Sequence, residues 1–367
     1  MHADEEGFLY PVTNEEKCVK CGVCESLCPV FNKPSISIDP FNAVAFACVN
    51  KNQNVRLKSS SGGIFSLIAE RVLASGGVVF GVAFDENFHV EHRYAETREN
   101  AMAFRQSKYV QSWIGDVYRQ VEIFLKQRRL VLFCGTPCQT AGLHAYLGGT
   151  HDLLLTQDLI CHGVSSPRVW ESYLAMHKRR AASVIKDVHF RNKSRGWRQI
   201  SVKITFESGK EYCRTYSTDL FMRGFLAGLY LRPSCYACAF KTIHRQTDFT
   251  LADFWGVQHL CPELDDNKGT SLVFVNTLKG IDLFRSIMDD MLAMPVDTVN
   301  SARFNPSMEH SAALPKDRGI FFDRFREEGI AAVKGFCKIT LLRKIKTFFR
   351  DFFRRVYFMF HSGLPEK

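Results

Sequence analysis

The sequence predicts an α/β protein with α+β parts. From residue 59 onward, apolar runs of strand length alternate with segments of helical periodicity, a pattern typical of a mostly parallel sheet covered by helices. Residues 186–216 instead alternate with period two around Ser208-Gly209, which favours a hairpin and therefore a β-rich insertion. Closely spaced cysteines before residue 30 predict a separate small unit, and residues 338–360 have the periodicity of an amphipathic helix.

The N-terminal unit is defined by four cysteines, Cys18, Cys21, Cys24 and Cys28, with Pro29 directly after them. This is the spacing of a bacterial ferredoxin loop, in which thiolates hold a 4Fe–4S cluster. Structural zinc usually joins two separated ligand pairs, so zinc is the weaker interpretation. We therefore predict a ferredoxin-like cluster unit and a protein that moves electrons.

The cysteine before proline usually binds the other cluster of a two-cluster pair. The first residues, MHADEEGFLYP, resemble the link between two ferredoxin motifs and have no secretory features. Our hypothesis is that Met1 is an internal methionine of a longer reading frame. The alternative is a single-cluster version whose fourth ligand is Cys28 or Cys48.

The α/β elements follow from periodicity and from glycine or proline at their ends. We expect helices at 64–77, 115–127, 140–147, 217–231 and 280–292, and strands at 78–84, 130–134, 153–161 and 272–277. Residues 35–58 have no strong periodicity and are interpreted as a linker. The expected domains are therefore 1–50 for the cluster unit, 51–300 for the α/β domain with its insertion at 186–216, and 301–367 for a helical tail.

Composition places the chain among globular proteins of a reducing compartment. It has 367 residues, 46% hydrophobic content and 13 cysteines, and without a signal peptide such cysteines are more often metal ligands than disulfides. We expect a cytoplasmic protein, since no apolar run reaches the roughly 18 residues that span a bilayer. The net charge is +10, of which residues 338–367 carry +6. Because the basic charge is concentrated in the tail, we expect no nucleic-acid partner.

Residues 338–360 combine an apolar helical stripe with basic residues: the stripe is Leu341, Ile345, Phe348, Phe352, Val356 and Met359. This pattern is typical of a helix that lies on an anionic membrane surface. It predicts peripheral contact at the inner face of the membrane. The alternative is a helix packed on the body or on a partner.

A second set of cysteines lies in the α/β region, at Cys134, Cys138, Cys161, Cys235 and Cys238. Cys134 and Cys138 flank a turn between a strand and a helix, and Cys161 ends the next strand. The carboxyl ends of parallel strands meet at one edge of a sheet, where ligands bind. Three loops could therefore converge on one metal centre. The residues alone leave a second cluster, zinc and buried thiols open, since free cysteine is a common core residue.

Six segments in order resemble the coenzyme F420 hydrogenase/dehydrogenase beta-subunit family, most of all a bacterial branch found among surface-polysaccharide genes. The segments are SSSGGIF (59–65), QSKYVQS (106–112), GTPCQTAGL (135–143), DLICHGV (158–164), RPSCYAC (232–238) and DFTLADFWG (248–256). Members of that family are iron–sulfur flavoproteins, usually with FAD. The resemblance implies that Cys138, Cys161, Cys235 and Cys238 bind a 4Fe–4S cluster, in addition to the N-terminal one. It leaves Cys134 as a core thiol, and packing is the interpretation for Cys48, Cys213, Cys261 and Cys337.

The resemblance also implies an FAD site. Ser60, Ser61, Gly62 and Gly63 precede a helix and offer hydroxyls and unhindered N–H groups for phosphate or ring oxygens; an ordinary helix cap is the alternative. QSKYVQS supplies Lys108, Tyr109, Gln111 and Ser112, while Thr136 and Pro137 shape the turn beside flavin and cluster. No GxGxxG fingerprint follows a strand, which excludes an ordinary Rossmann NAD site.

Three further positions have both a functional and a structural interpretation. His162 follows Cys161 and could donate a proton near the flavin, although a lone histidine is more often structural. Asp253 could position a ligand or cap a turn. In the insertion, Arg195, Trp197 and Arg198 could recognise an anionic substrate, or they could lie in a solvated loop.

Together these features predict an iron–sulfur flavoprotein oxidoreductase. We expect electrons to pass from a ferredoxin-like donor through one or two 4Fe–4S clusters to FAD, and on to an organic acceptor that is F420-like or different. The alternative is an electron-transfer subunit that has no substrate site and serves a partner enzyme. A zinc-bound interaction protein at the membrane is a third interpretation.

Overall fold

A computed structural model describes residues 1–28 and 43–337, so the expected tail helix at 338–360 lies outside the described residues. Its centre is an eight-stranded sheet with strand order β13-β3-β12-β11-β7-β6-β4-β5. These strands are β3 (Val44–Asn50), β4 (Val78–Phe84), β5 (Val90–Ala95), β6 (Val131–Cys134), β7 (Leu154–Leu159), β11 (Phe249–Asp253), β12 (Ser271–Val275) and β13 (Met291–Val296).

The sheet is mixed, with a parallel centre. β4, β6, β7 and β11 run parallel to one another. β12 is antiparallel to β11, and β3 is antiparallel to β12, so β3 points the same way as the parallel strands. Only the two edge strands β5 and β13, together with β12, run the other way. The expected α/β class with a mostly parallel sheet is confirmed.

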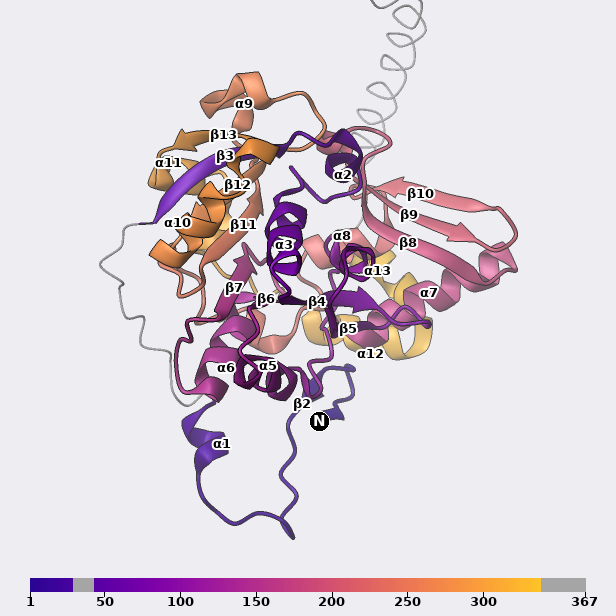
Figure 1. Cartoon of the computed structure of the whole chain (residues 1–367). Helices are drawn as coiled ribbons and strands as arrows, with labels where there is room; N and C mark the ends of the chain where they lie inside the picture. Colours follow the sequence, from indigo (N-terminus) through magenta and orange to yellow (C-terminus); the bar gives the residue numbers. More distant parts are fainter. Residues whose placement is uncertain (29–42, 338–367) are drawn as a thin grey trace, which may run out of the picture.

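Helices cover both faces of this sheet (Figure 1). On one face, α3 (Ile64–Ala74) and α10 (Leu278–Arg285) pack on a core that includes Val79 and Leu132. On the other, α5 (Val117–Lys126) and α6 (Pro137–Leu147) pack on Val78, Phe80 and Val131. Successive residues of β4 therefore face opposite helical layers, as the period of a strand buried on both sides requires.

The predicted insertion is a separate three-stranded antiparallel sheet of order β10-β9-β8. It consists of β8 (Ile185–Asn192), β9 (Ser201–Phe206) and β10 (Glu211–Thr215), and the expected hairpin turn at Ser208-Gly209 joins the last two. Figure 1 shows this sheet extending to one side above α7 (Pro167–Ala181). Its inner face shares a core with α7, α8 (Leu220–Leu226), α12 (Arg318–Glu328) and α13 (Val333–Phe336).

Three expectations about element boundaries were wrong. Residues 44–50, interpreted as part of a linker, form β3 between β12 and β13, and α2 (Gln53–Leu57) follows. The helix expected at 280–292 ends at Arg285, and an edge strand, β13, begins at Met291. The helix expected at 140–147 begins at Pro137, which suits the first turn because proline has no N–H to satisfy there. Cys138 therefore lies inside α6.

The first ten residues dock onto the body. β1 (His2–Ala3) and β2 (Leu9–Tyr10) form a small hairpin whose Phe8 is completely buried. Arg318 pairs with Glu6 and also donates to the Leu231 carbonyl at 3.0 Å. The short helix α1 (Val23–Ser26) carries Cys24 and lies at the lower end of the view in Figure 1. The remaining short helices are α4 (Arg98–Ala101), α9 (Val257–Leu260) and α11 (Thr298–Ala302).

Among the helices of residues 1–28 and 43–337, none has the length and apolar character needed to cross a membrane.

Candidate functional site

A cavity of about 840 Å³ opens where the parallel strands end. Residues at or just beyond the carboxyl ends of β6, β7 and β11 line it, together with the SSSGG loop before α3 and residues of the insertion. This is the edge at which open α/β sheets bind ligands. Its volume lies within the range of small-molecule and cofactor sites.

Four of the predicted cysteines gather beside this cavity. Burial raises the pKa of the Cys161 thiol, and the neighbouring Cys138, Cys235 and Cys238 raise it further. The pKa values of Cys138 and Cys235 are raised by burial first and then by the other cysteines of the same group. Because these effects require proximity, the structure places thiols from α6, from the loop after β7 and from the CxxC loop near one another. That these thiols bind one cluster stays a prediction.

Positive and hydroxyl groups surround the four thiols. Thr136 Oγ1 lies 3.1 Å from Cys138 Sγ, and Arg232 lowers the pKa of Cys138 against the effect of burial. Lys241 donates to the Cys161 carbonyl and, at 2.9 Å, to that of Ser307. Thiolates are the metal-binding form of cysteine, and cationic neighbours favour that form.

The donor set has the number of ligands that a 4Fe–4S cluster takes, four cysteines. Within the described residues, no group of three or more His, Cys, Asp or Glu side chains is placed to hold a single metal ion. A structural zinc would need four ligands within about 2.3 Å of one point, whereas each thiolate of a cubane cluster binds a different iron. At the N-terminus, Cys18, Cys21 and Cys24 are exposed and Cys28 is half-buried.

Some residues of the SSSGG loop line the cavity, and others make contacts that hold the fold together. Ser60 and Ser61 line the cavity, but the Ser61 hydroxyl donates to the Thr270 carbonyl at 2.7 Å. A Cβ on Gly62 would lie 2.3 Å from the Cys48 carbonyl, so this glycine permits close packing and does not line the cavity. Gly63 has φ +86° and gives α3 no side-chain cap, which leaves the first N–H groups of the helix open to an anion.

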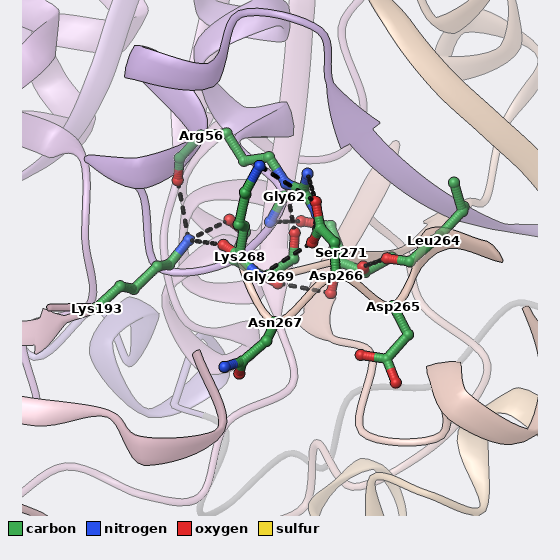
Figure 2. Close-up of polar contacts among 12 residues, drawn as sticks. Arg56, Gly62, Lys193, Leu264, Asp265, Asp266, Asn267, Lys268, Gly269 and Ser271 are labelled. Atoms are coloured by element: carbon green, nitrogen blue, oxygen red, sulfur yellow. Dashed lines mark hydrogen bonds and ion pairs between the residues drawn. The ribbon is translucent and has the colours of Figure 1, made fainter. Parts of the chain in front are cut away.

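Lys193 and Arg56 connect the SSSGG loop and the residues before it with residues 266–269 (Figure 2). Lys193 donates to the carbonyls of Arg56, Ser61 and Lys268 at 2.6–2.9 Å. Arg56 forms two 2.7 Å hydrogen bonds with Asp266. Burial, assisted by Arg191, lowers the pKa of Lys193 to about 7. Sequence inspection did not single out Lys193 or Arg56, because their partners lie far away along the chain.

The residues of the QSKYVQS segment (106–112) also differ in whether they line the cavity. Lys108, Tyr109 and Ser112 line the cavity, but Gln111 does not. Gln111 instead exchanges hydrogen bonds with the backbone of Leu9, so it holds the N-terminal hairpin. Lys108 donates to the carbonyls of Ala103 and Arg105 at 2.9 Å, and burial lowers its pKa to about 7.

The turn after β6 contributes one wall. Thr136 lines the cavity, and its N–H donates to Gln139 Oε1 at 2.9 Å, which caps α6. Pro137 faces a different, small cavity. His162 lines the large cavity, but its Nε2 lies 3.3 Å from the Phe225 carbonyl, and burial lowers its pKa.

A buried polar network from the insertion reaches the same cavity. Arg191 Nη2 lies 2.5 Å from Asp253 Oδ1, which also accepts from Trp197 Nε1 at 3.1 Å. Arg191 further donates to the Ser60 carbonyl and to the Tyr109 hydroxyl. Asp253 and Trp197 were candidates from the sequence, whereas Arg191 was missed. Arg198 lines the cavity and pairs with Asp265.

Three buried polar atoms in the cavity lining have no hydrogen-bond partner within the described chain. They are Gln157 Oε1, Arg191 Nε and Asn305 Nδ2. An unpaired buried polar group costs free energy that a ligand can recover. With the open N-terminus of α3, these atoms fit a ligand that has both polar heteroatoms and negative charge.

The fold and the cysteine set thus define an iron–sulfur protein with an α/β ligand domain. Residues 128–297 match the family described as the C terminus of the beta subunit of coenzyme F420 hydrogenase/dehydrogenase, and residues 11–31 match the 4Fe-4S binding domain. Residues 128–297 thus form a domain of the coenzyme F420 hydrogenase/dehydrogenase beta-subunit family, an oxidoreductase family, and an N-terminal 4Fe–4S motif precedes this domain. The resemblance inferred from the six sequence segments is therefore confirmed.

The fold has a counterpart among solved structures. A chain of the F420-reducing [NiFe] hydrogenase complex from Methanosarcina barkeri is similar with a TM-score of 0.50 and 16% identity, covering 78% of this chain and 95% of that chain. At this identity the likeness concerns the fold. No curated protein sequence matches the chain.

Proposed function

We propose that the chain is a flavin-dependent iron–sulfur oxidoreductase that passes electrons from a ferredoxin-like donor through 4Fe–4S clusters to FAD and on to an organic acceptor. The observation that carries this proposal is the position of the cavity next to the four gathered thiols, Cys138, Cys161, Cys235 and Cys238. Such a neighbourhood suits electron transfer between a cluster and an organic cofactor. The N-terminal cysteines would hold the entry cluster.

The cavity residues fit FAD in their chemistry. The N-terminus of α3 and the backbone around Ser60, Ser61 and Gly63 would bind the pyrophosphate. Lys108, Tyr109, Ser112 and Thr136 would contact the ring system, and His162 would exchange a proton through whichever ring nitrogen is free of the Phe225 carbonyl. Bound FAD would supply the two-electron chemistry.

The second candidate is an electron-transfer subunit that serves a partner enzyme. It is favoured by the structural relative, which is part of a hydrogenase complex. The two candidates differ in whether this chain has its own acceptor site. Arg191, Arg198, Gln199 and Ile200 of the insertion line an open cavity, and this favours the enzyme.

Rapid mixing of the anaerobic, flavin-loaded protein with reduced ferredoxin tests the proposal. We expect the flavin absorbance to bleach in the wild-type protein. In Cys235→Ser, with flavin content unchanged, we expect bleaching to slow at least about tenfold, because one ligand of the relay cluster is lost. Cys213→Ser, outside the set, is the matched control. Equal rates in Cys235→Ser and wild type would refute the proposed route.

A further inference from the structure

We propose that Trp255 is a stacking platform for the acceptor, which the geometry identifies as a flat conjugated ring with carbonyl oxygens, of the quinone class. The inference rests on the proposed function, because it concerns the acceptor end of the same cavity. The inference assigns to Trp255 a role in selecting the acceptor, whereas the proposed electron transfer from the clusters to FAD does not involve this residue.

The indole of Trp255 is partly exposed at the cavity. It lies just beyond β11, is 40% exposed and lines the cavity. Its ring stacks on Trp197 with centroids 4.7 Å apart and planes 9° from parallel. The buried Trp197 covers one face of Trp255, and the 40% exposure of Trp255 leaves part of its indole uncovered for a ligand. A second flat ring on that uncovered part would continue the stack.

Trp197, on which Trp255 stacks, is fixed in its position. Trp197 Nε1 donates to Asp253 Oδ1 at 3.1 Å, and Asp253 is fixed by its ion pair with the buried Arg191. A ring that is held in place loses little conformational freedom when a ligand binds, so more of the stacking free energy appears as affinity.

Exposed apolar side chains line the same cavity. Leu159 and Leu226 line the cavity and are 40% and 52% exposed. Large apolar side chains that stay exposed inside a concave site are typical of ligand pockets, because an apolar ligand covers them. The acceptor would therefore have a hydrophobic ring body.

Unpaired donors near the platform favour carbonyl oxygens on that ring. Asn305 is 6% exposed and lines the cavity with an unpartnered Nδ2. It lies close to Trp255, because the preceding Phe304 packs directly on Gly256: a Cβ there would be 2.2 Å from the Phe304 ring. Arg191 Nε is a second buried donor without a partner. A carbonyl oxygen accepts from either group and recovers the cost of burial.

The test is a binding titration of the oxidised, flavin-loaded protein with anthraquinone-2-sulfonate, followed by calorimetry. We expect binding to the wild-type protein and a Kd about tenfold or more higher in Trp255→Leu, from the loss of one stacking contact. Trp255→Phe retains an aromatic face and should stay within about threefold of the wild type. Trp113→Leu is the matched control, since Trp113 is 57% exposed but does not line the cavity.

Each outcome decides the inference separately from the proposed function. An unchanged Kd in Trp255→Leu, or no binding to the wild-type protein, would overturn the proposed role of Trp255. The flavin content of the protein would still support the proposed flavin-dependent function. Loss of flavin in Trp255→Leu would assign the indole to the flavin itself and overturn it too. If the wild-type protein binds no flavin, the proposed function fails, and the same titration on the flavin-free protein still decides the role of Trp255.

Discussion

Cys134 and Cys161 show how single residues at one sheet edge acquire different roles. Both lie at or near the carboxyl end of a parallel strand and both line the cavity. Burial raises both thiol pKa values, but only Cys161 is also affected by Cys138, Cys235 and Cys238. Cys161 therefore belongs to the group of four thiols, whereas Cys134 does not.

We therefore expect Cys161→Ser to lose about four irons and the matching acid-labile sulfide per chain, because one cluster loses a ligand. Cys134→Ser should keep its iron. Iron and sulfide analysis after anaerobic purification measures both. Iron loss in Cys134→Ser but not in Cys161→Ser would show that the ligand set is wrong.

Lys193 predicts a specific pH dependence of stability. Its folded-state pKa of about 7 lies below the value of 10.5 that it has when free. Between these values the unfolded chain binds the additional proton, so the stability of the folded protein rises with pH, by up to about 1.4 kcal/mol per pH unit. We expect the melting temperature of the wild type to rise from pH 7 to pH 9 relative to Lys193→Met. Parallel pH profiles of the two proteins would contradict this origin.

At the site, cysteine spacing and glycine pattern were readable from the sequence because they are local. The partners of the buried charged side chains could not be predicted from the sequence. Arg191 and Asp253 are 62 positions apart, and Lys193 bonds to carbonyls 75 to 137 positions away. Contacts between residues so far apart along the chain leave no periodic pattern in the sequence. Gln111 shows the reverse case: a segment that suggested a flavin contact contains one side chain that binds the N-terminal hairpin instead.

At the scale of elements, local patterns predicted β4, α3 and the insertion hairpin closely. β3 was missed because its place depends on pairing with β12 and β13, more than 200 residues away. β13 was missed because a helical pattern in residues 280–292 continues past the true end of α10. Tertiary pairing overrides local preference in such strands.

The junction of β3, β12 and the SSSGG loop gives an element-scale prediction. Gly62→Ala would place a Cβ 2.3 Å from the Cys48 carbonyl and 2.8 Å from the Ser271 nitrogen. We expect a loss of at least about 2 kcal/mol in the free energy of unfolding, as for an overpacked core. Gly319→Ala in α12 meets nothing within 4 Å and is the control. Equal urea midpoints for the two variants would refute the close packing.

The N-terminal hairpin of β1 and β2 gives a second prediction at the scale of elements. Arg318→Met removes the pair with Glu6 and the bond to the Leu231 carbonyl, which should weaken docking by roughly 2 kcal/mol. We expect proteinase K to remove the first residues faster than in wild type. Arg326→Met, at an exposed pair with Glu5, should behave as wild type. Unchanged cleavage in Arg318→Met would show that this arginine does not hold the hairpin.

At the scale of the whole molecule, the docked hairpin joins the two cysteine units. Arg232 donates to the Leu9 carbonyl at 3.0 Å, and its guanidinium lies 4.3 Å from the centre of the Tyr10 ring. Its own carbonyl accepts from Cys235 N–H at 2.8 Å. One residue thus connects the segment that leads to the N-terminal cysteines with the CxxC loop of the core.

The most direct test of this account is the amount of iron, acid-labile sulfide and flavin per chain after anaerobic purification. The account predicts about one FAD with about eight irons and equal sulfide when both clusters form, or about four irons when only the core cluster forms. Zinc without sulfide, or iron and sulfide without any flavin, would contradict it.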